Sequence, residues 1–167
     1  MTKEEFLNRI KEDEEYSPGW QAIDDAFEKL YPVQKPDHFG TTIPSRAMWG
    51  GDEYLDGFSV YTSPKGYKHL VTYGMTVLYG DEEAFGGEWN GWGYEMTIKL
   101  KEKDTENCMW AINMMSNLAR YTYKTKRFSE IQAIIEDQNN IPKLIELMKA
   151  DGNEDLVTDM RRNKSYL

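Results

Sequence analysis

The fold is decided by one stretch in the middle of the chain, residues 57–79, which reads GFSVYTSPKGYKHLVTYGMTVLY. Its first six residues alternate between the two sides of an extended backbone, as in a half-buried strand. Residues 63–66 then supply the Ser, Pro and Gly of a turn. Residues 69–73 and 75–79 are rich in β-branched and aromatic side chains, and Gly74 between them indicates a bulge or the close approach of another backbone. The stretch therefore predicts successive strands joined by short connections.

Two helices are predicted upstream, in a helical N-terminal part that covers residues 1–31. The second of them begins with Ser17 as N-cap and Pro18 at the first helical position, and Pro32 and Pro36 end it. Each helix has an apolar stripe at helical spacing: Phe6, Leu7 and Ile10 in the first, and Trp20, Ile23, Phe27 and Leu30 in the second.

Downstream, a further strand is predicted over 94–100 and a helix over 105–123. One face of the strand carries Tyr94, Met96, Ile98 and Leu100, and the core-facing stripe of the helix carries Met109, Ile112, Met115 and Ala119. Short strands are expected near 41–43, 128–135 and 156–157, and a short helix over 143–149. This order predicts one α+β (mixed α/β) domain, residues 1–167, with a largely antiparallel or mixed sheet flanked by N-terminal and later helices.

The charge is the most informative part of the composition. There are 29 acidic and 20 basic side chains, a net charge of −9, and the excess lies in the first hundred residues. Direct nucleic-acid binding is disfavoured because phosphates attract clustered Lys and Arg. An acidic face attracts basic proteins, although it also serves solubility alone. The chain has neither an apolar run of membrane-spanning length nor a secretory signal, so we expect a cytoplasmic protein without membrane contact.

The usual motifs of metal sites and activated nucleophiles do not occur. His38 and His69 stand far apart, and neither HExxH nor CxxC is present. Both histidines are therefore interpreted as structural, and the single cysteine, Cys108, as a buried small hydrophobic residue. The glycine-rich segment 86–93 lacks the lysine of a phosphate-binding loop. The sequence predicts no metal and no cofactor.

Carboxylates are the remaining route to catalysis. Asp56, Asp81 and Glu95 each stand at a strand or loop boundary, and a hydrolase that uses them stays open as a third candidate function. In a chain this acidic, such groupings also arise by coincidence. We interpret Asp56-Gly57 as a structural turn in which the glycine takes a positive φ, and we expect a protein that is not an enzyme.

The loop 80–93 is the candidate docking surface. It mixes the acids Asp81, Glu82, Glu83 and Glu88 with the aromatic residues Phe85, Trp89 and Trp92, among several glycines. Acids at the rim and aromatic anchors at the centre are typical of protein interfaces. Alternatively, both tryptophans fold back onto the sheet, and the docking site then lies near Arg161 and Arg162.

Six segments in order resemble the suppressor-of-fused domain family. They are HFGT (38–41), LDGFSVY (55–61), HLVTYG (69–74) running on to LYG (78–80), GWGYEMTIKL (91–100), NLARY (117–121) and LVTDMRR (156–162). The resemblance covers about residues 20–127 and 141–167. It implies a mixed α/β sheet domain without known catalytic activity.

The resemblance also implies a protein partner. Animal members hold a peptide of a zinc-finger transcription factor by β-strand addition. Bacterial members resemble immunity proteins that neutralise secreted polymorphic toxins, often nucleases, and an acidic chain fits this group. The predicted partner is thus a basic toxin domain; the alternative is a peptide-binding regulator or scaffold. Family peptide contacts carry over to the Tyr79-Gly80-Asp81 corner and to Arg161 and Arg162, which completes the predicted partner-binding set: Tyr79, Asp81, Glu82, Glu83, Trp89, Trp92, Arg161 and Arg162.

One region departs from the family pattern. The family has several more strands between the helix that ends near Tyr121 and the closing segment around 158–162. Here only residues 122–157 intervene, with 128–155 as the shortened part. Either this member lacks those strands, or the sequence is incomplete there.

Overall fold

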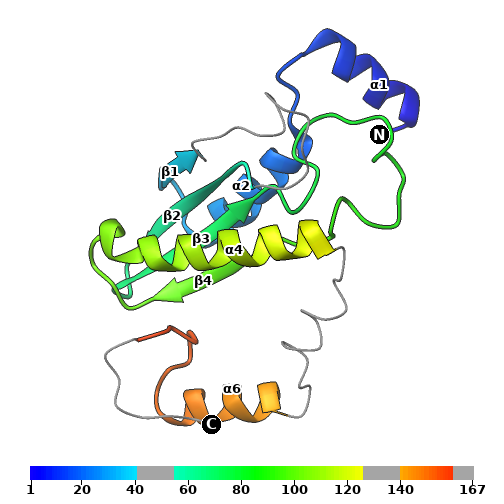
Figure 1. Cartoon of the computed structure of the whole chain (residues 1–167). Coiled ribbons are helices and arrows are strands. Elements are labelled where there is room, and N and C mark those ends of the chain that lie inside the picture. Colours follow the sequence, from blue (N-terminus) through cyan, green and yellow to red (C-terminus); the bar gives the residue numbers. More distant parts are fainter. Residues whose placement is uncertain (41–54, 126–139, 160–167) are drawn as a thin grey trace.

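The computed structural model describes residues 1–40, 55–125 and 140–159, and in these it shows an antiparallel sheet between two helical layers (Figure 1). The described strands are β1 (Asp37–Gly40), β2 (Gly57–Ser63), β3 (Tyr67–Tyr73) and β4 (Thr97–Leu100), and they neighbour one another in chain order. The helices are α1 (Lys3–Glu12), α2 (Pro18–Leu30), the short 3-10 helix η1 (Thr105–Cys108), α4 (Met109–Thr125) and α6 (Asn140–Ala150). The predicted α+β class is confirmed.

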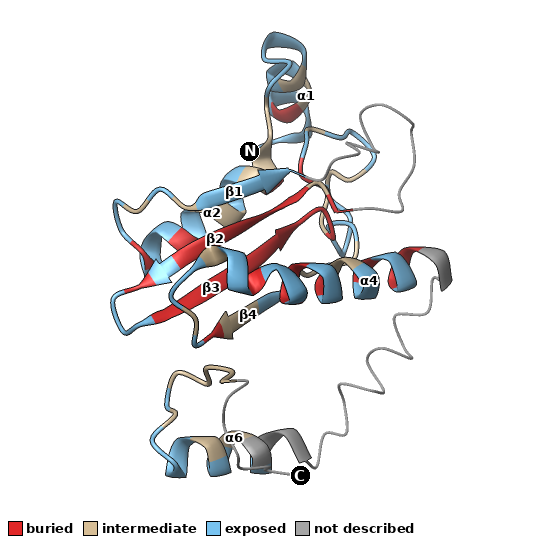
Figure 2. Ribbon diagram, turned by 60° about the vertical axis from the view of Figure 1, so that its left-hand side comes forward, coloured by how far each residue is buried: buried red, intermediate tan, exposed pale blue. Residues whose placement is uncertain are grey.

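The central hairpin sends its side chains alternately to the two helical layers. β2 and β3 pair in the register Val60 with Leu70 and Tyr61 with His69. The first pair faces α4 and the second faces α2, because successive strand residues point to opposite faces. All seven residues of β3 are buried, as expected for a strand covered on both sides (Figure 2).

Each face of the sheet has its own apolar cluster. Beneath α4 lie Phe58, Val60, Leu70 and Leu100 of the sheet with Cys108, Ala111, Ile112, Met115, Ala119 and Tyr123. Beneath α2 lie Phe27 and Tyr31 with Tyr61, Val71, Tyr73 and Leu78. The expectation that Cys108 is buried is confirmed.

Helix α2 follows its predicted stripe until the last turn. Phe27 is buried, and Trp20 and Ile23 pack against the same cluster. Leu30 is 61% exposed, so the prediction that it faces the core is wrong. Tyr31, four residues after Phe27 and the C-cap of the helix, takes that buried place instead.

The two N-terminal helices are capped differently. Thr2 and Glu5 form a reciprocal capping box at the start of α1. Ser17 stands at the N-cap of α2 as predicted, but its hydroxyl donates to the carbonyl of Glu15 instead of capping the helix.

Several predicted elements differ from the structure. Residues 75–79 are not a strand, because the chain leaves the sheet at Gly74, where φ is +122°. The strand predicted over 94–100 is regular only from Thr97, although its apolar face packs on the α4 cluster as expected. Met109 is 42% exposed and not part of the core. The strands predicted near 41–43 and 128–135 lie outside the described residues.

Gly57 is a glycine because β1 approaches it closely. A Cβ at this position would lie 2.7 Å from the carbonyl oxygen of Phe39 and 2.9 Å from Nε2 of His38. Its φ is not positive, so the predicted reason is wrong. The structural interpretation is nevertheless supported, since the backbone N–H of the preceding Asp56 donates to the carbonyl of Tyr73 at 2.7 Å.

We expect mild acid to destabilise this fold through His69. Its buried ring bonds the hydroxyls of Tyr31 (2.8 Å) and Thr97 (2.5 Å), and burial, helped by Lys99, lowers its pKa from 6.5 to about 4. A depressed folded-state pKa means that this stability is present above pH 6.5 and is lost as the pH falls through about 4. Urea unfolding across this range should show a loss that His69→Gln reduces. Parallel stability curves for the two proteins would contradict the assignment.

Candidate functional site

The second half of loop 80–93 is fixed by the segment that follows β3. Oδ1 of Asn90 accepts from the N–H of Val77 (2.9 Å), and Nδ2 donates to its carbonyl (3.2 Å). The N–H of Trp92 donates to the carbonyl of Met75 at 2.8 Å. Gly91, at φ +60°, packs so closely that a Cβ would lie 2.8 Å from that same carbonyl oxygen. This half is therefore a rigid platform.

The first half of the loop rests on α1. The Phe85 ring lies 4.8 Å from the ring of Phe6, the one residue of that helix that is buried. A Cβ on Gly80 would lie 2.7 Å from Ile10, and Lys3 pairs with Glu82 at 3.5 Å across the exposed surface. The N-terminal helix and the loop are thus in contact, and Figure 1 shows α1 and this loop side by side.

The two tryptophans of the loop have different environments. Trp92 packs on the α4 cluster, with its ring 6.1 Å from that of Tyr123. This tryptophan therefore folds back onto the core, as the alternative interpretation of the loop predicts. Trp89 is 68% exposed, and Tyr79, which directly precedes the loop, is 48% exposed. A Cβ on Gly93 would lie only 2.9 Å from the Trp89 indole, so the ring rests on the Gly93 backbone. Trp89 is thus an exposed aromatic side chain held against a fixed support.

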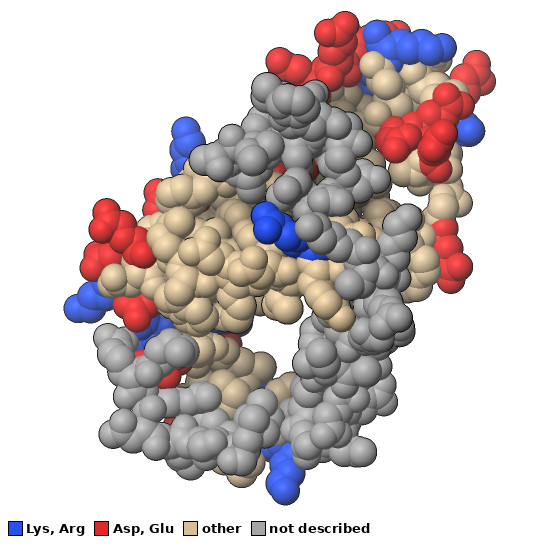
Figure 3. Space-filling model, viewed as in Figure 1, with Lys and Arg blue, Asp and Glu red and all other residues tan. Residues whose placement is uncertain are grey.

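The loop that carries this exposed ring is also acidic. Asp81, Glu82, Glu83 and Glu88 are all exposed. Figure 3 shows further acidic groups at the end of the molecule that carries α1, with basic groups among them, since α1 itself has as many basic as acidic side chains. Arg161 and Arg162, the other part of the predicted partner-binding set, lie outside the described residues.

The three candidate catalytic acids do not form a common site among the described residues. Glu95 is used structurally: it accepts from the Thr72 hydroxyl (2.6 Å), from the Gly74 N–H (3.0 Å), and from both the N–H and the hydroxyl of Thr76 (2.9 and 2.8 Å). Burial raises the pKa of its carboxyl, and these hydrogen bonds oppose the shift. Asp56 also approaches Gly74, whereas Asp81 lies in the exposed loop and accepts from the Glu83 N–H.

The described part of the chain has neither a cluster of metal ligands nor a membrane-spanning helix. No three His, Cys, Asp or Glu side chains gather there as metal ligands would. None of the helices described is long and apolar enough to span a membrane.

Helix α4 carries a second apolar stripe that the sequence analysis missed. Trp110, Met114, Leu118 and Tyr121 recur at helical spacing and are each about 40% exposed. The spacing of these four residues can be seen in the sequence. However, the buried stripe of the same helix has the same spacing, so the second stripe does not stand out. Both faces of α4 are therefore apolar.

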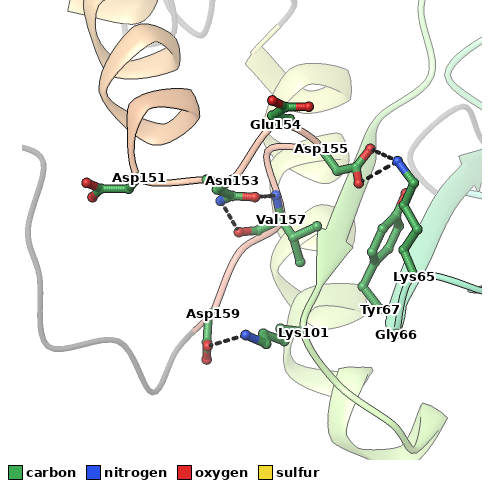
Figure 4. A pocket seen from close by; sticks show the side chains of 11 residues that line it. Lys65, Gly66, Tyr67, Lys101, Asp151, Asn153, Glu154, Asp155, Val157 and Asp159 are labelled. Carbon is green, nitrogen blue, oxygen red and sulfur yellow. Dashed lines mark hydrogen bonds and ion pairs between the residues drawn. The ribbon is translucent and has the colours of Figure 1, made fainter.

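A hollow of about 610 Å³ separates the β2–β3 turn from the segment after α6 (Figure 4). Its charges pair with one another: Lys65 with Asp155 at 2.8 Å, and Lys101 with Asp159 at 3.7 Å. Next to it, Thr158 forms a parallel bridge with Leu100, close to the strand fragment predicted at 156–157. The hollow thus lies where the last described segment is attached to the sheet.

Comparison with known proteins identifies the family. Residues 51–138 match the model of the suppressor of fused protein (SUFU) family, which is more than half of the chain. The chain therefore belongs to the SUFU family. It is also similar to a chain of the Sufu-Fu complex crystal structure, with 26% sequence identity and a TM-score of 0.54. That similarity covers 66% of this chain and 55% of the other, so this chain spans about half of that protein. No curated protein sequence matched.

Proposed function

We propose that this protein is a non-enzymatic immunity protein that binds and neutralises a basic toxin domain in the cytoplasm. Membership of the SUFU family and the similarity to a protein solved as a complex with Fu support a protein-binding role. The acidity favours a basic partner, since opposite charges speed association. Glu95, one of the catalytic candidates, already accepts hydrogen bonds from backbone and hydroxyl groups, which disfavours the hydrolase alternative.

The observation that carries this proposal is the exposed Trp89 in a loop that also carries four exposed acids. Tryptophan is enriched among the residues that contribute most to binding, and an anchor already held in place loses less entropy when a partner docks. The Asn90 and Gly93 contacts hold it in this way. The rim acids Asp81, Glu82 and Glu83 would meet the basic side chains of the toxin.

A growth assay tests the proposal. Cells that express a basic toxin encoded next to this gene should stop growing, and co-expression of this protein should restore growth. A Leu30→Ala variant serves as the control and should protect the cells as the parent does. Leu30 is an exposed apolar residue on α2, away from the loop. Lack of protection by a folded, abundant protein would overturn the immunity role.

A Trp89→Ala variant should bind the toxin with an affinity lower by about 2 kcal/mol or more, roughly 30-fold, as truncation of a central aromatic anchor does. Its melting temperature should stay that of the parent, because the ring is mostly exposed. Calorimetric titration measures the first quantity and thermal unfolding the second. The opposite pattern, lower stability with unchanged affinity, would show that Trp89 is a packing residue.

The second candidate function is a peptide-binding regulator or scaffold. It is favoured by β1, which ends the sheet in the described part of the chain and has all four residues exposed. An exposed edge accepts an added strand. This candidate predicts a stable intracellular partner and no protection from any toxin.

A further inference from the structure

A cavity of about 350 Å³ opens between α2 and the edge formed by β1 and β2. It shares no lining residue with loop 80–93. Two carboxylates, Asp24 and Glu28, stand one helical turn apart on α2 and line it, and the partly exposed Trp20 supplies an aromatic wall. The cavity therefore combines negative charge with an aromatic side chain.

A chain of hydrogen bonds makes the floor of this cavity rigid. Oδ1 of Asp24 accepts from the Tyr73 hydroxyl (2.8 Å), which in turn accepts from Oγ of Ser59 (3.2 Å). That Oγ bonds Nδ1 of His38 at 3.0 Å. The Trp20 ring lies 4.5 Å from the Tyr73 ring and 5.2 Å from the His38 ring, so the wall is fixed to the same chain of bonds.

The two carboxylates have no cationic partner among the described residues. No ion pair within 4.0 Å involves Asp24 or Glu28 there, although Lys35 also lines the cavity. Partial burial lowers the pKa of His38 below 6.5, and Asp24 opposes the shift, so the imidazole is mainly neutral at pH 7. Like charges four residues apart on a helix repel each other, and a bound cation would relieve that repulsion.

We propose that this cavity binds the guanidinium group of an arginine side chain carried by a polypeptide. A guanidinium is planar and stacks on a Trp or Tyr ring while its N–H groups reach carboxylates in a fork. An ammonium group has neither the plane nor the fork. The inference does not rest on the proposed immunity function, since it concerns a different surface and needs no toxin.

Titration of the full chain with N-acetyl-arginine amide tests this site, with the Trp20 indole N–H followed by NMR. Saturable binding is expected. The lysine analogue should bind about fivefold more weakly, and the citrulline analogue, which keeps the shape but lacks the charge, should not saturate. Saturation by citrulline, or no saturation by arginine, would overturn the proposal. Tighter binding of free L-arginine than of the blocked form would assign the site to a free amino acid instead.

Two matched variants of α2 complete the test. Glu28→Gln should weaken binding of the arginine analogue about fivefold or more, since it removes a charge that lines the cavity. Asp25→Asn removes the same charge at an exposed residue that bonds Gln21 and does not line the cavity, and it should leave affinity within about twofold. Equal losses in the two variants would show general charge attraction and not a site.

Discussion

A Phe27→Ala variant is expected to lose about 3–5 kcal/mol of unfolding free energy, the usual range for a large core aromatic residue. Phe27 is buried at the centre of a group of rings: Tyr61 lies 4.9 Å away, His69 lies 5.0 Å away and Tyr31 lies 6.3 Å away. Removing the ring leaves a cavity between α2 and the sheet, which this packing closes only partly. Urea unfolding followed by tryptophan fluorescence measures the loss.

The control for Phe27 lies three residues further along the same helix. Leu30 fell on the stripe predicted from the sequence, but it is 61% exposed, and Leu30→Ala should change stability by no more than about 0.5 kcal/mol. Equal losses in the two variants would mean that the helix is rotated relative to its place in this structure.

The second large effect is expected at Glu95. Replacement by alanine removes the acceptor for the N–H groups of Gly74 and Thr76, and each buried donor left without a partner costs about 1–3 kcal/mol. We therefore expect a loss of about 2–4 kcal/mol, measured by urea unfolding. Loss of an enzymatic activity in a stable Glu95→Gln protein would instead revive the hydrolase alternative.

The Glu95 carboxyl also gives a pH signature that differs from that of His69. Burial raises its folded-state pKa above the ordinary value of 4.5. The proton-linked part of its contribution to stability is therefore fully present below pH 4.5 and is lost as the pH rises through the folded-state value, whereas the hydrogen bonds it accepts from Gly74 and Thr76 do not require the proton. Glu95→Gln should remove this dependence, and an unchanged pH profile in the variant would contradict the assignment.

The parts of the fold that sequence reasoning predicted are those with local signals. Period-two alternation around one turn predicted the hairpin of β2 and β3, and Pro18 marked the start of α2. Residues 75–79 have the composition of a strand, but their backbone groups bond Asn90 and Trp92 in a later loop, Glu95, and the start of α2 at Gly19 and Trp20. Such pairing depends on the tertiary arrangement, and composition does not record it.

The candidate surfaces were predictable to different degrees. The loop 80–93 stood out by composition, but only the packing distinguishes Trp89, which is exposed, from Trp92, which lies on the core. The cavity beside α2 was missed because its residues come from α2, β1, β2 and the segment 33–36. In the sequence, Asp24 and Glu28 look like an ordinary solvated helix face.

We propose that this protein acts by binding a basic protein through an acidic surface. The most direct test is the association rate of the purified protein with the basic toxin domain proposed as its partner, measured over a range of salt concentrations. We expect a stable complex that forms more slowly as salt rises, because exposed charges are screened beyond about 8 Å at physiological ionic strength, while dissociation changes less. Absence of a complex, or an association rate that does not depend on salt, would contradict this account.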